Sequence, residues 1–308
     1  MIDNKVYDIL IIGSGPGGLT AAIYAKRAEA DIAILEKSAP GGKVVKTSTV
    51  ENYPGVENIE GPDLAMNMFM QTQNLGVPFI GAEVISVVKK KNIFEVKTKD
   101  KVYKAKTVII GTGTIERKVG AIGEDKYYGK GVSYCAVCDG ALYKEKRLAV
   151  IGGGYAALEE AMYLTKFASK VFVIHRRQGF RAESNVIKKA QANKKITFIL
   201  DATLNEVYGD DVVRGLKYEQ IIDKKIIDLP DIAAVFPYIG ADPIVNFIED
   251  KSILDDNNYI KVNNKCETTI KGLYAIGDVT NTPLRQIATA VSDGAKAAQF
   301  AIEYLDKM

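Results

Sequence analysis

The stretch that decides the fold is Gly13-Ser14-Gly15-Pro16-Gly17-Gly18. It follows an apolar run over residues 7–12 and opens an alanine-rich stretch that predicts a helix to about residue 30. The first, third and sixth residues of the motif permit a tight turn, close approach of the backbone to a pyrophosphate, and close packing of helix on strand. A second apolar run ends at Glu36, where a carboxylate can accept hydrogen bonds from ribose hydroxyls. We therefore favour a dinucleotide site over a glycine turn of purely structural use.

The same pattern recurs 139 positions further along the chain. The apolar run 147–151 leads into Gly152-Gly153-Gly154-Tyr155-Ala156-Ala157, and the next apolar run ends at His175, which takes the place of Glu36. Because the repeat contains no gap, it predicts two dinucleotide-binding βαβ units within one chain.

The residues after His175 distinguish the two sites. Arg176, Arg177 and Arg181 replace the carboxylate of the first site by a cluster of guanidinium groups. Such a cluster suits a 2′-phosphate, whereas a carboxylate suits free ribose hydroxyls. The first site therefore favours FAD or NAD and the second favours NADP, the alternative being that the arginines form an ordinary basic surface turn.

Other segments suggest how the two units are connected. Short alternating runs over residues 83–88, 92–98 and 101–105 predict an antiparallel β-meander, and the apolar run over residues 107–110 predicts a separate buried strand. A last apolar run over residues 272–276 ends in Gly277-Asp278, which resembles part of a nucleotide site although it lies far from the first repeat. We therefore expect an α/β fold with two Rossmann-like domains, three-layered, with a parallel sheet and a meander, the second domain inserted into the first. The expected boundaries are 1–116, 117–244 and 245–308.

Reactive side chains are scarce, because the chain has three cysteines, one histidine and no tryptophan. Two of the cysteines form Cys135-Ala136-Val137-Cys138, and a pair at this spacing can close a small disulfide in which one thiol has a lowered pKa. A zinc site needs four ligands, and only Cys266 and His175 remain, so we expect no metal and treat Cys266 as a packing residue. Asp139 is the nearest candidate acid for a departing thiolate, unless it is only a turn or cap residue.

Composition narrows the class of protein. The net charge is +3 with both signs mixed along the chain, which gives no reason to expect binding to nucleic acid or an anionic membrane. No run approaches the ~18 apolar residues of a membrane helix, and no signal peptide is visible. We expect a cytoplasmic protein.

Together these motifs resemble those of the low-molecular-weight, bacterial-type thioredoxin reductases, class II pyridine nucleotide-disulfide oxidoreductases, over essentially the whole chain. Further matching marks are Glu51-Asn52-Tyr53-Pro54-Gly55 and Gly277-Asp278 with Arg285-Gln286. The resemblance implies a homodimer that uses NADPH and FAD to reduce thioredoxin, with rotation of the inserted domain between flavin reduction and flavin oxidation. Cys138 would face the flavin, Cys135 would attack the partner's disulfide and Asp139 would be the acid.

The resemblance also implies the cofactor-binding residues. For FAD in the first domain these are Gly13, Ser14, Gly15, Pro16, Gly18, Glu36, Lys37, Gly41, Gly42, Lys43, Asn52, Val84, Thr112, Gly277, Asp278, Arg285, Gln286, Ile287 and Ala288. For NADPH in the inserted domain they are Gly152, Gly154, Tyr155, Ala156, Ala157, His175, Arg176, Arg177 and Arg181.

Some positions depart from the family pattern. Tyr155 and Ala156 stand where small polar residues are usual, and Lys43 stands where glutamine is common. Two alternatives therefore stay open. One is a related FAD- and NADPH-dependent disulfide reductase that serves another thiol carrier. The other is a non-catalytic nucleotide-binding redox sensor in which Cys135 and Cys138 form the switch.

Overall fold

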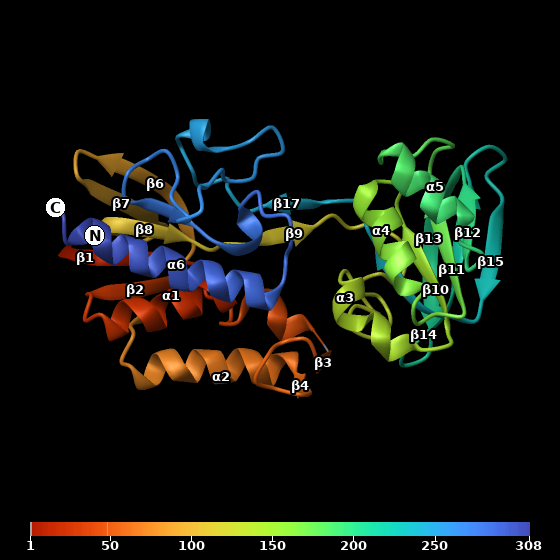
Figure 1. Ribbon diagram of the computed structural model, residues 1–308, viewed down its shortest axis with the longest axis horizontal. Coiled ribbons are helices and arrows are strands. Elements are labelled where there is room, and N and C mark those ends of the chain that lie inside the picture. Colours follow the sequence, from red (N-terminus) through yellow and green to blue (C-terminus); the bar gives the residue numbers. More distant parts are fainter. Residues whose placement is uncertain (1, 48) are drawn as a thin grey trace. The chain divides into compact units, whose positions relative to one another are not determined.

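The computed structural model describes residues 2–47 and 49–308, and the chain divides into two compact units (Figure 1). The first unit consists of Met1–Ile115 and Asp242–Met308, and the second of Glu116–Ala241. The second is therefore inserted into the first in sequence. Its two connections to the first unit, β9 (Thr114–Glu116) and β17 (Ala241–Pro243), pair with each other in a two-stranded sheet.

The first unit is built on a sheet with the strand order β5-β2-β1-β8-β7-β6. Its parallel strands are β1 (Ile2–Ile12), β2 (Ile32–Glu36), β5 (Phe79–Gly81), β8 (Val102–Ile110) and β18 (Leu273–Ala275). The meander consists of β6 (Val84–Lys90) and β7 (Ile93–Thr98), followed by the first half of β8. A small hairpin, β3 (Thr49–Val50) with β4 (Ile59–Glu60), precedes α2 (Gly61–Asn74).

Two hydrophobic cores lie on the two faces of this sheet, because neighbouring residues of a strand point to opposite sides. Ile9 and Ile11 of β1 face the core formed with α1 (Pro16–Arg27) and α6 (Ile287–Leu305), while Leu10 faces the core under the meander. Helices α1 and α6 lie side by side (Figure 1), and a Cβ at Gly294 would collide with the carbonyl of Gly17. Also in this unit are α2 (Gly61–Asn74) and the 3₁₀ turns η1 (Gly42–Lys46), η3 (Lys251–Ile253) and η4 (Gly277–Val279).

The second unit repeats the design around a parallel sheet with the order β12-β11-β10-β16. These strands are β10 (Arg147–Ile151), β11 (Lys170–His175), β12 (Ile196–Leu200) and β16 (Ile232–Pro237). One face packs on α4 (Tyr155–Leu164) and α5 (Ser184–Ala192), and the other on an antiparallel sheet of β13 (Ala202–Gly209), β14 (Val213–Gln220) and β15 (Ile226–Pro230). The short α3 (Ala136–Asp139) and η2 (Gly140–Tyr143) precede β10.

The predicted fold class, two Rossmann-like units with the second inserted into the first, is confirmed. In each unit a strand leads through a glycine loop into a helix and then into a parallel neighbouring strand. One strand differs from expectation. Residues 101–105 and 107–110 were expected to form two strands, but they form the single strand β8, which changes its partner from β7 to β18 along its length.

None of the helices in residues 2–47 and 49–308 combines the length and the apolar composition that crossing a bilayer requires.

Candidate active site

The glycines of the first loop serve two different purposes. A Cβ at Gly13, whose φ is +101°, would collide with the carbonyl of Gly111, and a Cβ at Gly18 would collide with the carbonyl of Gly13. The chain itself therefore requires glycine at both positions. Gly15 is different, because its φ is −69° and a Cβ there would find nothing within 4 Å.

The open space beside Gly15 fits a bound phosphate. Gly15 is the N-cap of α1 and supplies no side-chain hydrogen bond to the helix, so the first-turn N–H groups point at this space without a capping side chain. Exposed N–H groups and the helix dipole together favour an anion. The loop therefore fits the pyrophosphate of a dinucleotide such as FAD.

Glu36 lies at the end of β2 and is held against the loop. Its Oε2 accepts hydrogen bonds from the backbone N–H of Ser14 at 2.8 Å and from its Oγ at 2.9 Å, and its Oε1 accepts one from the N–H of Ser38 at 2.9 Å. A carboxylate has about four lone-pair sites, so it retains capacity to accept bonds from ribose hydroxyls. Ser14 is fully buried, and its hydroxyl orients the carboxylate.

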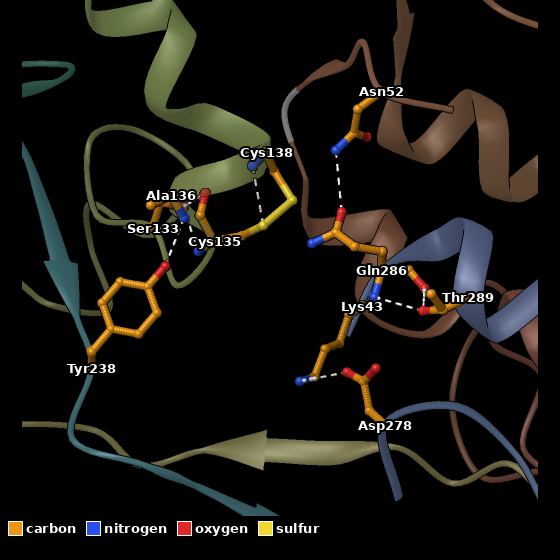
Figure 2. Close-up of a disulfide and its surroundings, with 10 residues drawn as sticks. All are labelled: Lys43, Asn52, Ser133, Cys135, Ala136, Cys138, Tyr238, Asp278, Gln286 and Thr289. Atoms are coloured by element: carbon orange, nitrogen blue, oxygen red, sulfur yellow. Dashed lines mark hydrogen bonds and ion pairs between the residues drawn. A yellow bond between two sulfur atoms is a disulfide. The ribbon is translucent and has the colours of Figure 1, made fainter. Parts of the chain in front are cut away.

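Several other predicted FAD residues come together from distant segments of the first unit (Figure 2). The Nζ of Lys43 donates to Oγ1 of Thr114 at 2.6 Å and lies 3.4 Å from Oδ2 of Asp278. The amide of Asn52 donates to Oε1 of Gln286 at 3.1 Å, and Gln286 forms a capping box with Thr289 at the start of α6. Thr114 was not predicted, because its contact with Lys43 spans 71 positions and has no local signal.

The remaining predicted FAD residues also lie in the first unit. Gly41 has φ +108° and donates its N–H to the carbonyl of Ser14 at 2.8 Å. The hydroxyl of Thr112 donates to the carbonyl of Ile244 at 2.8 Å, and the guanidinium of Arg285 lies 4.6 Å from the ring centre of Tyr259. The others lie at the ends of elements: Pro16 in α1, Lys37 after β2, Gly42 in η1, Val84 in β6, Gly277 in η4, and Ile287 and Ala288 in α6.

Cys135 and Cys138 form a disulfide in the second unit, with their Cα atoms 5.3 Å apart (Figure 2). Cys135 is the N-cap of α3, and its Sγ accepts the N–H of Cys138 at 3.2 Å. Two further contacts fix the motif, because the N–H of Cys135 donates to Oγ of Ser133 at 3.1 Å and the N–H of Ala136 donates to the hydroxyl of Tyr238 at 2.7 Å. Sequence reasoning missed Ser133 and Tyr238, and Tyr238 lies 102 positions away from its partner.

Asp139 closes α3 with a buried carboxyl group. The residue is 9% exposed, and its Oδ1 is the one buried side-chain polar atom in the described part of the chain that has no hydrogen-bond partner. Burial raises the pKa of this carboxyl above its usual value, and the hydroxyl of Ser133 partly offsets the effect. The side chain makes no capping bond to η2, so the interpretation as a cap residue finds no support. A buried, readily protonated carboxyl group can donate a proton.

The third cysteine, Cys266, is buried in the first unit and is a free thiol. Burial, with a further contribution from Asp293, raises its pKa to about 12. The group therefore stays a protonated thiol at neutral pH and packs as a small apolar side chain.

The second glycine loop repeats the division of roles seen in the first. A Cβ at Gly152, whose φ is +143°, would collide with the carbonyl of Tyr238, and a Cβ at Gly153 would collide with the ring of His175. Gly154 has φ −88° and would place a Cβ in open space at the N-cap of α4. A phosphate therefore fits beside Gly154 as it does beside Gly15.

The residues after β11 place positive charge at this loop. The N–H of Arg181 donates to the carbonyl of Gly153 at 2.8 Å, and the three arginine side chains are exposed. His175 is turned inward, with its ring stacked on Phe180 at 5.6 Å and its Nε2 3.1 Å from the carbonyl of Gly179. Burial, followed by the neighbouring arginines, lowers the pKa of this imidazole, so the positive charge at the loop comes from the arginines.

Tyr155 and Ala156 begin α4, and Ala157 is buried beneath them. Tyr155 is 46% exposed, and its hydroxyl donates a hydrogen bond to Oε1 of Glu159 at 2.6 Å.

The predicted FAD residues all lie in the first unit, and the redox pair and the predicted NADPH residues all lie in the second. Within residues 2–47 and 49–308 no three His, Cys, Asp or Glu side chains are arranged to hold a metal ion.

Known proteins are similar to this chain over nearly its whole length. The model of the pyridine nucleotide-disulphide oxidoreductase family matches residues 7–294. A thioredoxin reductase of Mycoplasma pneumoniae is 44% identical over 95% of this chain and 93% of its own length, and one of Bacillus subtilis is 40% identical over 100% and 98%. The crystal structure of thioredoxin reductase from Streptococcus pyogenes has 44% identity and a TM-score of 0.95, over 99% of this chain and all of that one. The chain belongs to the thioredoxin reductases of this family. The resemblance seen in the sequence is confirmed, and FAD and NADPH are the cofactors of the family.

Proposed function

We propose that the protein reduces the disulfide of thioredoxin with electrons from NADPH, through FAD and the Cys135–Cys138 pair. The observation that carries the proposal is the disulfide at the start of α3, next to a buried carboxyl group with an unpartnered oxygen. The same unit holds a second glycine loop with three arginines beside it. A dithiol switch, a proton donor and an NADPH site are the parts that such a reductase needs on the protein side.

The proposal assigns binding residues to both cofactors. Gly15 and Gly154 leave room for pyrophosphates at the N-termini of α1 and α4. Glu36 accepts hydrogen bonds from the ribose hydroxyls in the first site. Arg176, Arg177 and Arg181 bind the 2′-phosphate in the second. When bound, FAD carries the two electrons between NADPH and the disulfide. Domain rotation, a homodimer and a cytoplasmic location are part of this proposal and rest on the family resemblance.

The cysteine chemistry follows from the contacts around α3. Two electrons and two protons convert the Cys135–Cys138 disulfide to a dithiol, and Asp139 supplies a proton to the leaving thiolate. The Cys135 thiol then loses its proton, and its thiolate attacks the thioredoxin disulfide to form a mixed disulfide. The thioredoxin thiolate that this attack displaces takes up the proton. Cys138 attacks Cys135 Sγ, which releases dithiol thioredoxin and restores the starting disulfide.

The test is NADPH oxidation by the FAD-loaded protein with and without thioredoxin. We expect consumption only with the acceptor, and we expect Cys138→Ser to abolish turnover while the flavin is still bleached by NADPH. Cys266→Ser is the matched control, since it makes the same exchange at a buried thiol of the first unit, and it should turn over normally. Turnover by Cys138→Ser at the wild-type rate would refute the relay. Activity with another disulfide but not with thioredoxin would favour a different thiol carrier, and no activity with any acceptor would favour the redox sensor.

A further inference from the structure

Tyr238 connects two functional parts of the second unit. It follows β16, and its N–H donates to the carbonyl of Ile151 at the end of β10, at 2.7 Å. Its carbonyl lies so close to Gly152 that only glycine fits there. Its side chain packs against the core beneath α4 and reaches α3, where the hydroxyl accepts the N–H of Ala136 at 2.7 Å (Figure 2). The backbone of Tyr238 therefore packs against the second glycine loop, while its side chain binds the start of α3, which carries the Cys135–Cys138 pair.

The N–H of Ala136 needs this partner. Ala136 is the first residue of α3, and N–H groups in the first turn of a helix have no partner within the helix. Ala136 is fully buried, so water does not replace the phenol. Burial raises the pKa of the Tyr238 hydroxyl, which therefore accepts the bond as a neutral group.

This contact does not depend on the disulfide, because it involves no sulfur atom. In the oxidised protein the S–S bond itself ties Cys135 to Cys138. In the reduced protein that tie is gone, and the position of Cys135 relative to α3 depends on the bonds of its neighbours. Within the motif these are the N–H of Asp139 to the carbonyl of Cys135 at 3.1 Å and the N–H of Cys138 to Cys135 Sγ. From outside the motif they are the bond from the N–H of Cys135 to Ser133 and the bond from the N–H of Ala136 to Tyr238.

We propose that Tyr238 is a positioning residue that keeps the reduced Cys135 and Cys138 at closing distance, and so favours re-formation of the disulfide. Two thiols that are held together behave as if at a higher effective concentration, which shifts the thiol–disulfide equilibrium towards the disulfide. The proposal rests on the redox activity of the pair and not on the identity of the thiol carrier.

The test is the equilibrium of the FAD-loaded protein with glutathione under anaerobic conditions. In this reaction the dithiol and one oxidised glutathione give the Cys135–Cys138 disulfide and two reduced glutathiones, and alkylation followed by mass spectrometry measures the oxidised fraction. We expect Tyr238→Phe to lower the equilibrium constant for disulfide formation about fivefold, the effect of one ordinary hydrogen bond. The dissociation constant for NADPH should stay unchanged, because the contact with Gly152 is made by the backbone, and an unchanged constant also shows that the unit is folded.

Tyr127→Phe is the matched control. Its hydroxyl donates to the carbonyl of Gly209 at 2.6 Å, in the same unit but away from α3, so its removal should leave the glutathione equilibrium unchanged. Equal constants for Tyr238→Phe and the wild type, or an equal shift in Tyr127→Phe, would overturn the proposal. If the wild type fails to reduce thioredoxin while Tyr238→Phe still shifts the equilibrium, the proposed function fails and this inference stands.

Discussion

The hydroxyl of Tyr134 donates to Oε1 of Glu124 at 2.7 Å, which ties the residue before Cys135 to a buried carboxylate. Glu124 is 3% exposed and also accepts the N–H groups of Val119 at 3.0 Å and Gly120 at 2.8 Å. Three donors compensate the burial of the charge. One side chain thus joins the loop after β9 to the segment that carries the redox pair.

Replacing Glu124 should therefore destabilise the second unit. Glu124→Ala leaves three partly buried donors without their partner, and we expect it to lower the free energy of unfolding by about 1–3 kcal/mol in urea titrations. Tyr134→Phe removes only the phenol donor and should cost about 0.5–1.5 kcal/mol. Unfolding of Glu124→Ala at the wild-type urea midpoint would contradict this role.

The two kinds of glycine in the first loop should respond differently to alanine. Gly15→Ala places its methyl group in open space at an ordinary φ, so the protein should fold but lose FAD, because the methyl group would occupy the space that we propose for the pyrophosphate. Gly18→Ala forces a collision with the carbonyl of Gly13 and should lower the melting temperature even without FAD. The measurements are the flavin-to-protein ratio from visible absorbance and thermal melting of the apoprotein. A full complement of FAD in Gly15→Ala would show that the phosphates lie elsewhere.

The arginines after His175 should set the choice between NADPH and NADH. Arg176→Ala combined with Arg177→Ala removes charge from the site that we propose for the 2′-phosphate, and we expect the ratio of kcat/KM for NADPH to that for NADH to fall at least about tenfold. Arg214→Ala removes another exposed guanidinium, which pairs with Asp210 in the β13–β14 hairpin, and it should leave the ratio unchanged. An unaltered ratio in the double variant would mean that these arginines form only a basic surface turn.

Glu160 on α4 should make stability depend on pH. Burial, followed by repulsion from Glu159, raises the pKa of its carboxyl from 4.5 to about 7. The ionised form therefore destabilises the fold above pH 7, and this penalty is relieved as the pH falls through 7 towards 4.5. Glu160→Gln should raise the melting temperature at pH 8, with an advantage that shrinks by pH 5. A constant difference between Glu160→Gln and wild type at all pH values would exclude this titration.

Local sequence patterns predicted most of the fold. The features that sequence reasoning missed are contacts between residues far apart in the chain. Both glycine loops were predictable, because strand, turn and helix follow one another along the chain. The contacts of Tyr238 with Ala136 and of Lys43 with Thr114 depend on the order of the strands in the sheets. The sequence near these residues contains no pattern that predicts either contact. His175 shows a further limit. Its register with Glu36 suggests a ligand position, yet the ring packs inward against Gly153, a contact that only the folded loop defines.

Strand β8 shows the same limit at the level of secondary structure. Lys106, which seemed to separate two strands, continues the strand and reaches sideways to Asp8 at 2.8 Å. The break in the hydrophobic pattern marks the point where β8 changes partner, from β7 to β18, and not a turn.

The pairing of β9 with β17 places the entry and exit of the inserted segment next to each other. A module with adjacent ends can be added to a host fold, or removed from it, with only a short splice at one surface position. If the inserted segment were removed, a tight turn could join β9 directly to β17 in the first unit. The repeated glycine motif and this pairing are the features expected of a chain in which a second βαβ unit occupies a loop of the first.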